Sequence, residues 1–402
     1  MKIPYYIIIM FTLAACQASA DKRTNQVDSL PIAQVAYLPD RDFYHDAVKE
    51  YVDEHLLNSN FSGGILVAKN GVIVYEHYAG FKDWRSKDSM TAETPIHIAS
   101  TTKTITAMAV LKLVEQGKLN LDDTLNKFFP QLAYDGITVQ MLLSHRTGLP
   151  NYLYYFEKNK WDKKKMVTNQ DVLESLYKKQ PGGGARPGRN FNYNNTNYVL
   201  LASLIEKISG FSYPEFLKKE IFDPLNMKHT YVYDMQHAAV ATPSFNWDGR
   251  FWSLDEFDLT YGDKNIYSTP RDLLKWDQAL NAGRVLNTAL LDSAYTPLSN
   301  ERPSVHNYGM GWRLLNLKNG KKVIYHHGRW HGFNSMFARL PEENATIVIL
   351  GNRYNRRIYE ARDMYDIFGN YSGKGKEQET EKNTNEANNN TNKRKASLSK
   401  KA

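Results

Sequence analysis

The chain has 402 residues, of which 42% are hydrophobic and 23% charged, a balance typical of a soluble globular protein with one large domain or two closely packed lobes. The net charge is +8, but residues 371–402 carry half of it, because they hold eight Lys and Arg residues against four Glu. The remaining body is only mildly basic, which argues against a nucleic acid as its partner.

The N-terminal stretch MKIPYYIIIMFTLAACQASA has the layout of a secretion signal, with Lys2, an apolar run and a box of small residues. The apolar run is too short to span a bilayer. Leu13-Ala14-Ala15-Cys16 resembles the box of bacterial lipoproteins, in which the cysteine becomes the lipidated first residue. We therefore expect a signal peptide over residues 1–15 and a lipid anchor on Cys16 that holds the protein on a membrane of the cell envelope. A plain cleaved signal is the alternative.

The polar residues 16–40 include Pro31 and Pro39 and are expected to form a tether. The pattern of residues 41–58 predicts a helix. The segment GGILVAKNGVIVYEHYAG has two β-rich runs around Lys69-Asn70-Gly71. Because Asn-Gly favours a type I′ turn, this segment predicts a β-hairpin.

The next segment, IASTTKTITAMAVLKLVEQGKL at residues 98–119, predicts a buried helix, because almost every side of it is apolar between Thr104 and Gly117. Gly117 is suited to end this helix. The N-terminal end nevertheless carries Ser100 and Lys103, which their spacing places on one face. A hydroxyl and an amine therefore meet at the edge of the core.

Residues 120–300 mostly have the patterns of helices and loops, and strand patterns return in YGMGWRLLNL, KKVIYHHG, FNSMFARL and ATIVILGN. This order predicts an α+β fold (an α/β sandwich): an antiparallel sheet built from both chain ends and flanked by helices, with a mostly helical lobe inserted. We assign residues 41–370 to this domain. The Asn- and Lys-rich residues 371–402 lack apolar periodicity and are expected to be disordered.

The pattern Ser-x-x-Lys begins at Ser19, Ser100, Ser175 and Ser397, and only at Ser100 does it open a buried helix. A serine hydroxyl becomes a nucleophile when a base takes its proton. Burial disfavours the charged form of an amine, so Lys103 is a candidate for that base. Free N–H groups at the start of the helix can stabilise an oxyanion. The alternative is that Ser100 merely caps the helix and Lys103 is solvated.

Two further motifs follow. Tyr193-Asn194-Asn195 is the one Tyr-x-Asn of the chain; its phenol can relay a proton, and the Asn195 amide can bind a substrate carbonyl or orient the lysine. A packed tyrosine beside a turn is the alternative. His326-His327-Gly328 ends a strand, where a glycine lets a substrate backbone lie against the strand edge.

Ser-x-x-Lys, Tyr-x-Asn and His-x-Gly, in this order, resemble the three motifs of the penicillin-recognising serine hydrolases. The nearest branch comprises class C β-lactamases, D-alanyl-D-alanine carboxypeptidases and related esterases. The resemblance runs from about residue 45 to 355 and includes three flanking segments, ITVQMLLSHRTGLPNY, RPGRNFNYNNTNYVLL and IYSTPRDLLKW.

The resemblance implies catalytic roles for three residues. Ser100 would be the nucleophile, Lys103 its base and Tyr193 a second proton shuttle. The reaction would be acyl transfer from a small ester, amide or peptide through a serine ester, followed by hydrolysis, with no metal and no cofactor.

The resemblance also implies the groups that bind the substrate. Asn195 would contact the substrate amide. His326 would take the position of the cationic Lys or His, and Gly328 that of the strand glycine. The backbone N–H groups of Ser100 and Arg329 would form the oxyanion hole.

This sequence departs from the family pattern at three places. His326 replaces the lysine of class C β-lactamases, and an imidazole is only partly charged at pH 7, which favours a peptidase or esterase. His327, Arg329 and Trp330 stand where small residues are usual and could crowd the strand edge. YGDKNIYST, residues 261–269, replaces a glycine-rich segment.

Three hypotheses result. The first is a serine hydrolase that acts on a small ester or amide, such as a D-amino-acid peptide of cell-wall origin. The second is a β-lactamase. The third, of another class, is a catalytically silent envelope lipoprotein that binds peptidoglycan or a protein partner through the region where the family binds its substrates.

Other histidines favour no further site. His326, His327 and His331 suggest a metal centre, but alternation along a strand places the first two on opposite faces, so we expect no metal. His97 and His145 are expected to be packed structural residues.

Overall fold

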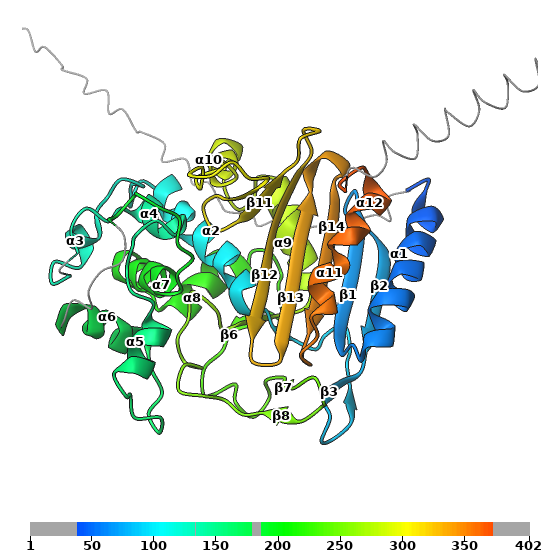
Figure 1. Cartoon of the computed structure of the whole chain (residues 1–402), viewed down its shortest axis with the longest axis horizontal. Coiled ribbons are helices and arrows are strands. Elements are labelled where there is room, and N and C mark those ends of the chain that lie inside the picture. The colour runs from blue at the N-terminus through cyan, green and yellow to red at the C-terminus, as the bar shows by residue number, and fades with distance from the viewer. Residues whose placement is uncertain (1–37, 133, 179–185, 373–402) are drawn as a thin grey trace, which may run out of the picture. The chain divides into compact units, whose positions relative to one another are not determined.

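The computed structural model describes residues 38–132, 134–178 and 186–372. The predicted signal peptide, the lipid site at Cys16, most of the tether and residues 373–402 lie outside the described residues. Within the described part, the fold is an antiparallel sheet with helices on both faces and a helical lobe at one edge (Figure 1). This confirms the α+β architecture expected from the order of the sequence patterns.

The central sheet joins the two ends of the described chain. In the described residues it has seven strands in the order β10-β11-β12-β13-β14-β1-β2, and each neighbouring pair is antiparallel. Its strands are β1 (Gly63–Lys69), β2 (Val72–Ala79), β10 (His306–Tyr308), β11 (Arg313–Asn316), β12 (Lys322–Trp330), β13 (Phe333–Leu340) and β14 (Ala345–Gly351). Smaller sheets pair β3 (Phe81–Asp83) with β4 (Asp88–Ser89), β9 (Ile266–Ser268) with both β5 (Ile96–His97) and β6 (Tyr231–Val232), and β7 (Ser244–Phe245) with β8 (Phe251–Trp252).

The helices divide between the sheet and the lobe. Those beside the sheet are α1 (Arg41–His55), α2 (Thr102–Glu115), α9 (Pro270–Asn281), α10 (Thr288–Ala294), α11 (Arg357–Glu360) and α12 (Tyr365–Phe368). Those of the lobe are α3 (Leu125–Phe128), α4 (Val139–Leu143), α5 (Tyr152–Lys158), α6 (Asn169–Lys178), α7 (Thr196–Ser209) and α8 (Tyr213–Leu217). Short 3₁₀ helices are η1 (Leu57–Ser59), η2 (Ala99–Thr101), η4 (Pro341–Glu343) and η5 (Ala361–Met364), and η3 (Lys218–Phe222) is a π-helix.

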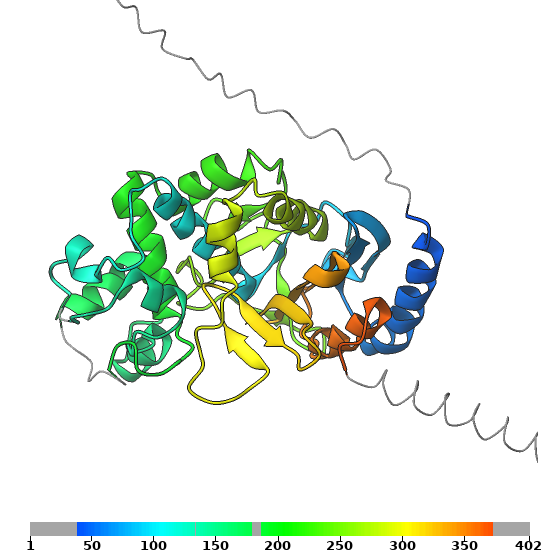
Figure 2. The ribbon, with the colours of Figure 1, turned by 90° about the horizontal axis from the view of Figure 1, so that it is seen from above.

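Two apolar layers enclose the sheet because its strands alternate their side chains between faces. On one face, α1, α11 and α12 cover alternate residues of β1, such as Ile65 and Val67. On the other face, α2 and α9 pack against Leu66 and Ala68, and this core continues into α4, α7 and α8 of the lobe. In Figures 1 and 2 the green lobe helices gather beside the β11–β12 side of the sheet, with α2 between them.

The local predictions hold closely. β1 and β2 form the expected hairpin, and Asn70 and Gly71 at its turn have φ of 52° and 75°, as a type I′ turn requires. Tyr371, one residue beyond the domain limit expected from the sequence, is buried against the layer of α1 and α12. No helix within the described residues has both the length and the apolar character needed to span a bilayer.

Candidate active site

Ser100 lies in the tight turn η2, immediately before the buried helix α2. Ala99 has a φ of 47°, in a region that few non-glycine residues adopt. The turn is held from both sides: the Ala99 N–H donates to Nδ1 of His97 at 3.0 Å, and the Ser335 hydroxyl on β13 donates to the Ile98 carbonyl at 2.7 Å. Ser100 itself is partly exposed. Contacts with the sheet thus hold Ser100 at the edge of the hydrophobic core.

Lys103 lies one turn further along and is fully buried. Its Nζ is 3.1 Å from Oγ of Ser100 and donates to the main-chain oxygen of Asp263 at 2.7 Å. Within the described chain, no carboxylate lies within ion-pair distance of this amine. The expected pair of hydroxyl and buried amine is therefore present with hydrogen-bonding geometry, and Ser100 is not the N-cap of α2, a position that Thr101 occupies.

Tyr193 and Asn195 come from the segment just before α7. Nζ of Lys103 is 5.1 Å from the centre of the Tyr193 ring. Asn195 is the N-cap residue of α7, but its side chain makes no capping bond, and its buried Oδ1 has no hydrogen-bond partner among the described residues. A buried acceptor without a donor costs about 1–3 kcal/mol. This oxygen is therefore suited to accept an N–H group from a substrate amide.

Strand β12 is the third element of the candidate site. β11 pairs with it only as far as Tyr325, so residues 326–330 pair with β13 alone, and no other described strand covers their second edge. A Cβ on Gly328 would come within 2.4 Å of the Ile98 carbonyl oxygen and 2.8 Å of the Ser100 nitrogen. Only glycine therefore lets β12 approach the nucleophile turn this closely. The next residue is Arg329, so its N–H is near enough in sequence to join the Ser100 N–H in an oxyanion hole.

His326 differs from the expected partly charged clamp. It is fully buried; Nδ1 donates to the His327 carbonyl oxygen at 2.7 Å, and Nε2 accepts the Tyr308 hydroxyl at 3.3 Å. Burial lowers the pKa of His326 well below its usual value, and the nearby cations Arg313 and Lys103 lower it further. The sequence pattern did not indicate this burial, because it does not reveal what packs around the ring.

The strand edge is less crowded than the sequence suggested. His327 and Arg329 face the other side of the sheet, where the His327 ring packs 5.2 Å from that of Tyr359 and the Arg329 guanidinium lies 4.9 Å from the Tyr354 ring. Burial lowers the pKa of His327 to about 3. Only Trp330 remains beside the cleft, where its Nε1 donates to Asp258.

The three histidines considered as metal ligands, His326, His327 and His331, do not form one cluster. His326 and His327 lie on opposite faces of β12, as strand alternation predicts, and His331 pairs with Asp258 at 3.0 Å. Asp255, Asp258 and His331 bring three possible metal ligands together, but Trp330 already donates to Asp258. His97 is packed as expected, and burial lowers its pKa to about 4.

Arg313, on β11, lies beside Tyr193, and the sequence motifs did not point to it. Its guanidinium lies 5.1 Å from the centre of the Tyr193 ring, on a strand that ends where the open edge of β12 begins. In the part of the chain that the structure describes, Arg313 has no carboxylate within ion-pair distance. The one available signal is its place directly after Gly311-Trp312, at the first residue of β11.

The replaced glycine segment still supports the site. Its main-chain oxygen at Asp263 accepts from Lys103, a contact that does not depend on the side chain. The Asp263 and Lys264 side chains are buried, and Nζ of Lys264 donates to the Tyr152 hydroxyl at 2.7 Å and lies 3.7 Å from the Asp263 carboxylate. The carbonyl that accepts from Lys103 therefore lies in a segment whose polar side chains are buried and paired.

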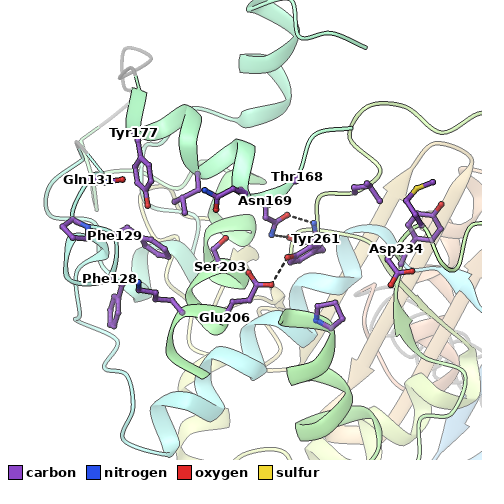
Figure 3. Close-up of a pocket in the computed structure, with 18 residues that line it drawn as sticks. Phe128, Phe129, Gln131, Thr168, Asn169, Tyr177, Ser203, Glu206, Asp234 and Tyr261 are labelled. Carbon is purple, nitrogen blue, oxygen red and sulfur yellow. Dashed lines mark hydrogen bonds between the residues drawn. The ribbon is translucent and has the colours of Figure 1, made fainter. Parts of the chain in front are cut away.

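A cavity of about 920 Å³ opens in the helical lobe (Figure 3). Its lining includes Phe129, Tyr177 and Glu206, and the Tyr261 hydroxyl donates to Glu206 there at 2.8 Å. None of the predicted catalytic residues lines it. The candidate active site is therefore defined by its hydrogen bonds rather than by the size of a cavity.

Comparison with known proteins gives a family match. Residues 48–368 match the Beta-lactamase family. Penicillin-binding protein 4* of Bacillus subtilis is 31% identical over 318 residues, which cover 75% of this chain and 70% of that protein. Protein flp of Staphylococcus aureus strain MW2 is 29% identical, and the match covers 74% of this chain but only 61% of that relative.

Solved structures give the same fold. D-amino acid amidase from Ochrobactrum anthropi SV3 has a TM-score of 0.67 and 25% identity, over 81% of this chain and 97% of the amidase. The octameric penicillin-binding protein homologue from Pyrococcus abyssi has a TM-score of 0.69 and 25% identity, over 80% of this chain and 76% of the homologue.

Proposed function

This chain belongs to the beta-lactamase family and is a serine hydrolase, and we propose that Ser100 is its nucleophile, Lys103 its general base and Tyr193 its second proton shuttle. The observation that carries the proposal is the 3.1 Å contact between Oγ of Ser100 and the fully buried amine of Lys103. An amine held against the serine hydroxyl is placed to take its proton, as activation of a serine nucleophile requires.

The proposed reaction has two halves. Lys103 takes the proton of Ser100 as Oγ attacks the substrate carbonyl carbon, and the Ser100 and Arg329 N–H groups stabilise the oxyanion. Tyr193 passes a proton to the departing alcohol or amine, which leaves an acyl ester on Ser100. Water then attacks this ester, the acid is released, and Ser100 recovers its proton.

For the substrate we propose a compound with a D-amino-acid amide bond, in particular a peptide whose C-terminus is a free carboxylate. The names of the similar proteins, a D-amino acid amidase and a penicillin-binding protein, support this class. Asn195 Oδ1 is free to accept the substrate N–H, and the open edge of β12 can align with an extended backbone. Arg313 supplies the positive charge that the neutral His326 does not, since a guanidinium stays charged at all physiological pH values.

Exchange of Arg313 for glutamine tests this assignment. For an N-acyl dipeptide of D-alanine with a free carboxylate, kcat/KM should fall by about 10–100-fold, the equivalent of one charged hydrogen bond. The C-terminal amide of the same peptide should lose less than about threefold. With the wild type, KM for the carboxylate substrate should stay constant from about pH 5.5 to 8, because a guanidinium keeps its positive charge over this range.

Arg362→Gln is the matched control, because this exposed arginine is in η5, a turn that follows β14 and lies outside the cleft. The assignment fails if Arg313→Gln weakens both peptides equally. A KM that rises with pH through the histidine range would instead indicate a charged His326. Nitrocefin belongs in the same assay: turnover faster than that of the peptide would favour the β-lactamase alternative.

We further propose that the protein is attached to the cell envelope by a lipid on Cys16. The support is the Leu-Ala-Ala-Cys sequence that follows an apolar run, together with the absence of any other cysteine. The wild type should fractionate with membranes and incorporate labelled palmitate, whereas Cys16→Ser should lose the label. A Cys16→Ser protein that keeps the label would place the lipid elsewhere, and an unlabelled wild type would favour a plain cleaved signal.

A further inference from the structure

Tyr193 lies in a segment without regular secondary structure, so its position depends on tertiary contacts. Both of its neighbours are held by one residue. The Asn192 N–H donates to the main-chain oxygen of His145 at 2.8 Å, and the Asn194 N–H donates to Nδ1 of the same histidine at 3.2 Å. His145 therefore accepts hydrogen bonds from the backbone on either side of the proposed proton shuttle, Tyr193.

His145 is itself firmly placed. It follows α4 with a φ of 57° and is fully buried. Its ring lies 4.4 Å from the ring of Tyr193 and 5.0 Å from that of Tyr198. These contacts bring the imidazole against the face of the side chain whose backbone it holds.

The hydrogen bonds also fix which ring nitrogen carries the proton. The Thr147 hydroxyl donates to Oδ1 of Asn197 at 2.6 Å, so the other end of this amide, Nδ2, points to Nδ1 of His145, 3.2 Å away. Nδ1 therefore accepts from both Asn194 and Asn197 and carries no proton. Burial lowers the pKa of His145 well below its usual value, and Lys103 and Arg313 lower it further, so the ring stays neutral and Nδ1 remains an acceptor.

We propose that His145 is a positioning residue for Tyr193: its main-chain oxygen and its Nδ1 set the place of the phenol relative to Ser100 and Lys103. This inference rests on the proposed role of Tyr193 and extends it to a residue that the sequence motifs assign only to packing. His145 acts through the backbone of residues 192 and 194 and need not touch the substrate.

Two amide substitutions separate positioning from packing. Asparagine carries its oxygen on Cγ, where histidine carries Nδ1, and it tolerates positive φ well. Glutamine has the same amide but places it one bond further out, near the position of Nε2. His145→Asn should keep kcat within about threefold of the wild type, whereas His145→Gln should lower it on the order of 10²-fold, with KM within about threefold in both, because a small displacement of a catalytic group slows chemistry more than binding.

Thermal unfolding of both variants provides the structural readout. A role in packing alone predicts that loss of kcat follows loss of Tm, so the smaller asparagine should be at least as damaging as glutamine. The positioning role predicts that activity follows the acceptor at Cγ whatever the order of the two Tm values. Equal loss of kcat in both folded variants would overturn the proposal, as would wild-type kcat in His145→Gln. If His145→Gln does not fold, a drop of kcat in folded His145→Asn beyond about tenfold would overturn it equally.

A double-mutant cycle with Tyr193→Phe links the two residues. In the wild-type background His145→Gln should lower kcat on the order of 10²-fold. In the Tyr193→Phe background it should lower kcat by less than about threefold, since the hydroxyl to be positioned is gone. If His145→Gln slows both backgrounds equally, the positioning proposal alone fails. If Tyr193→Phe retains wild-type kcat, the proposed role of Tyr193 itself fails.

Discussion

Replacement of Ser100 by alanine is expected to abolish formation of the acyl-enzyme and to lower kcat on the order of 10⁶-fold, as loss of the nucleophile does in other serine hydrolases. The fold should persist, because the partly exposed Ser100 side chain adds little to the core. The measurements are hydrolysis of short acyl esters and D-alanyl peptides, and the mass of the intact protein after reaction with a fluorophosphonate.

The chain offers a matched control for this test. Ser175 also begins a Ser-x-x-Lys sequence, but it lies within α6, where its hydroxyl donates to the Val172 carbonyl oxygen at 2.7 Å. Ser175→Ala should keep wild-type labelling and turnover. Labelling that persists in Ser100→Ala would place the nucleophile elsewhere, and an unreactive wild type would favour the catalytically silent alternative.

Replacement of Lys103 by methionine is expected to lower kcat by about 10²–10⁴-fold, the usual contribution of a general base. Methionine has a similar length and suits a buried site, so the helix should remain packed. Lys103→Arg is expected to be as slow as Lys103→Met, although it keeps a positive charge, because a guanidinium does not give up its proton in proteins.

Lys112→Met provides the control, since this lysine is on the same helix and nearer its other end. It should leave kcat unchanged. Thermal unfolding of all variants separates loss of the base from loss of the fold. A Lys103→Arg enzyme with more than a tenth of wild-type kcat would mean that the charge at this position matters and that its proton transfer does not.

Local sequence features predicted most of the fold. Asn70-Gly71 predicted the β1–β2 hairpin because its turn type depends on neighbouring residues alone. The all-round apolar pattern after Ser100 predicted that α2 is buried. The order of strand and helix patterns predicted a sheet made from both chain ends, and β14 indeed pairs with β1. The burial of Tyr371, by contrast, depends on contacts with distant segments.

In the candidate active site, too, some features follow from local sequence and others from contacts between distant segments. Ser100 and Lys103 are three residues apart, and one helical turn brings them together in any fold that keeps that turn. The sequence therefore determined this pair, along with the opposite orientations of His326 and His327, which follow from strand alternation.

Tertiary structure alone decided the burial of His326, the place of Arg313 beside Tyr193 and the hydrogen bonds of His145 to residues 192 and 194. Each depends on which atoms surround a group, and here those atoms come from distant parts of the chain. A motif specifies chemistry through neighbours on one element, whereas burial, tautomer and electrostatic environment arise only when several elements pack together.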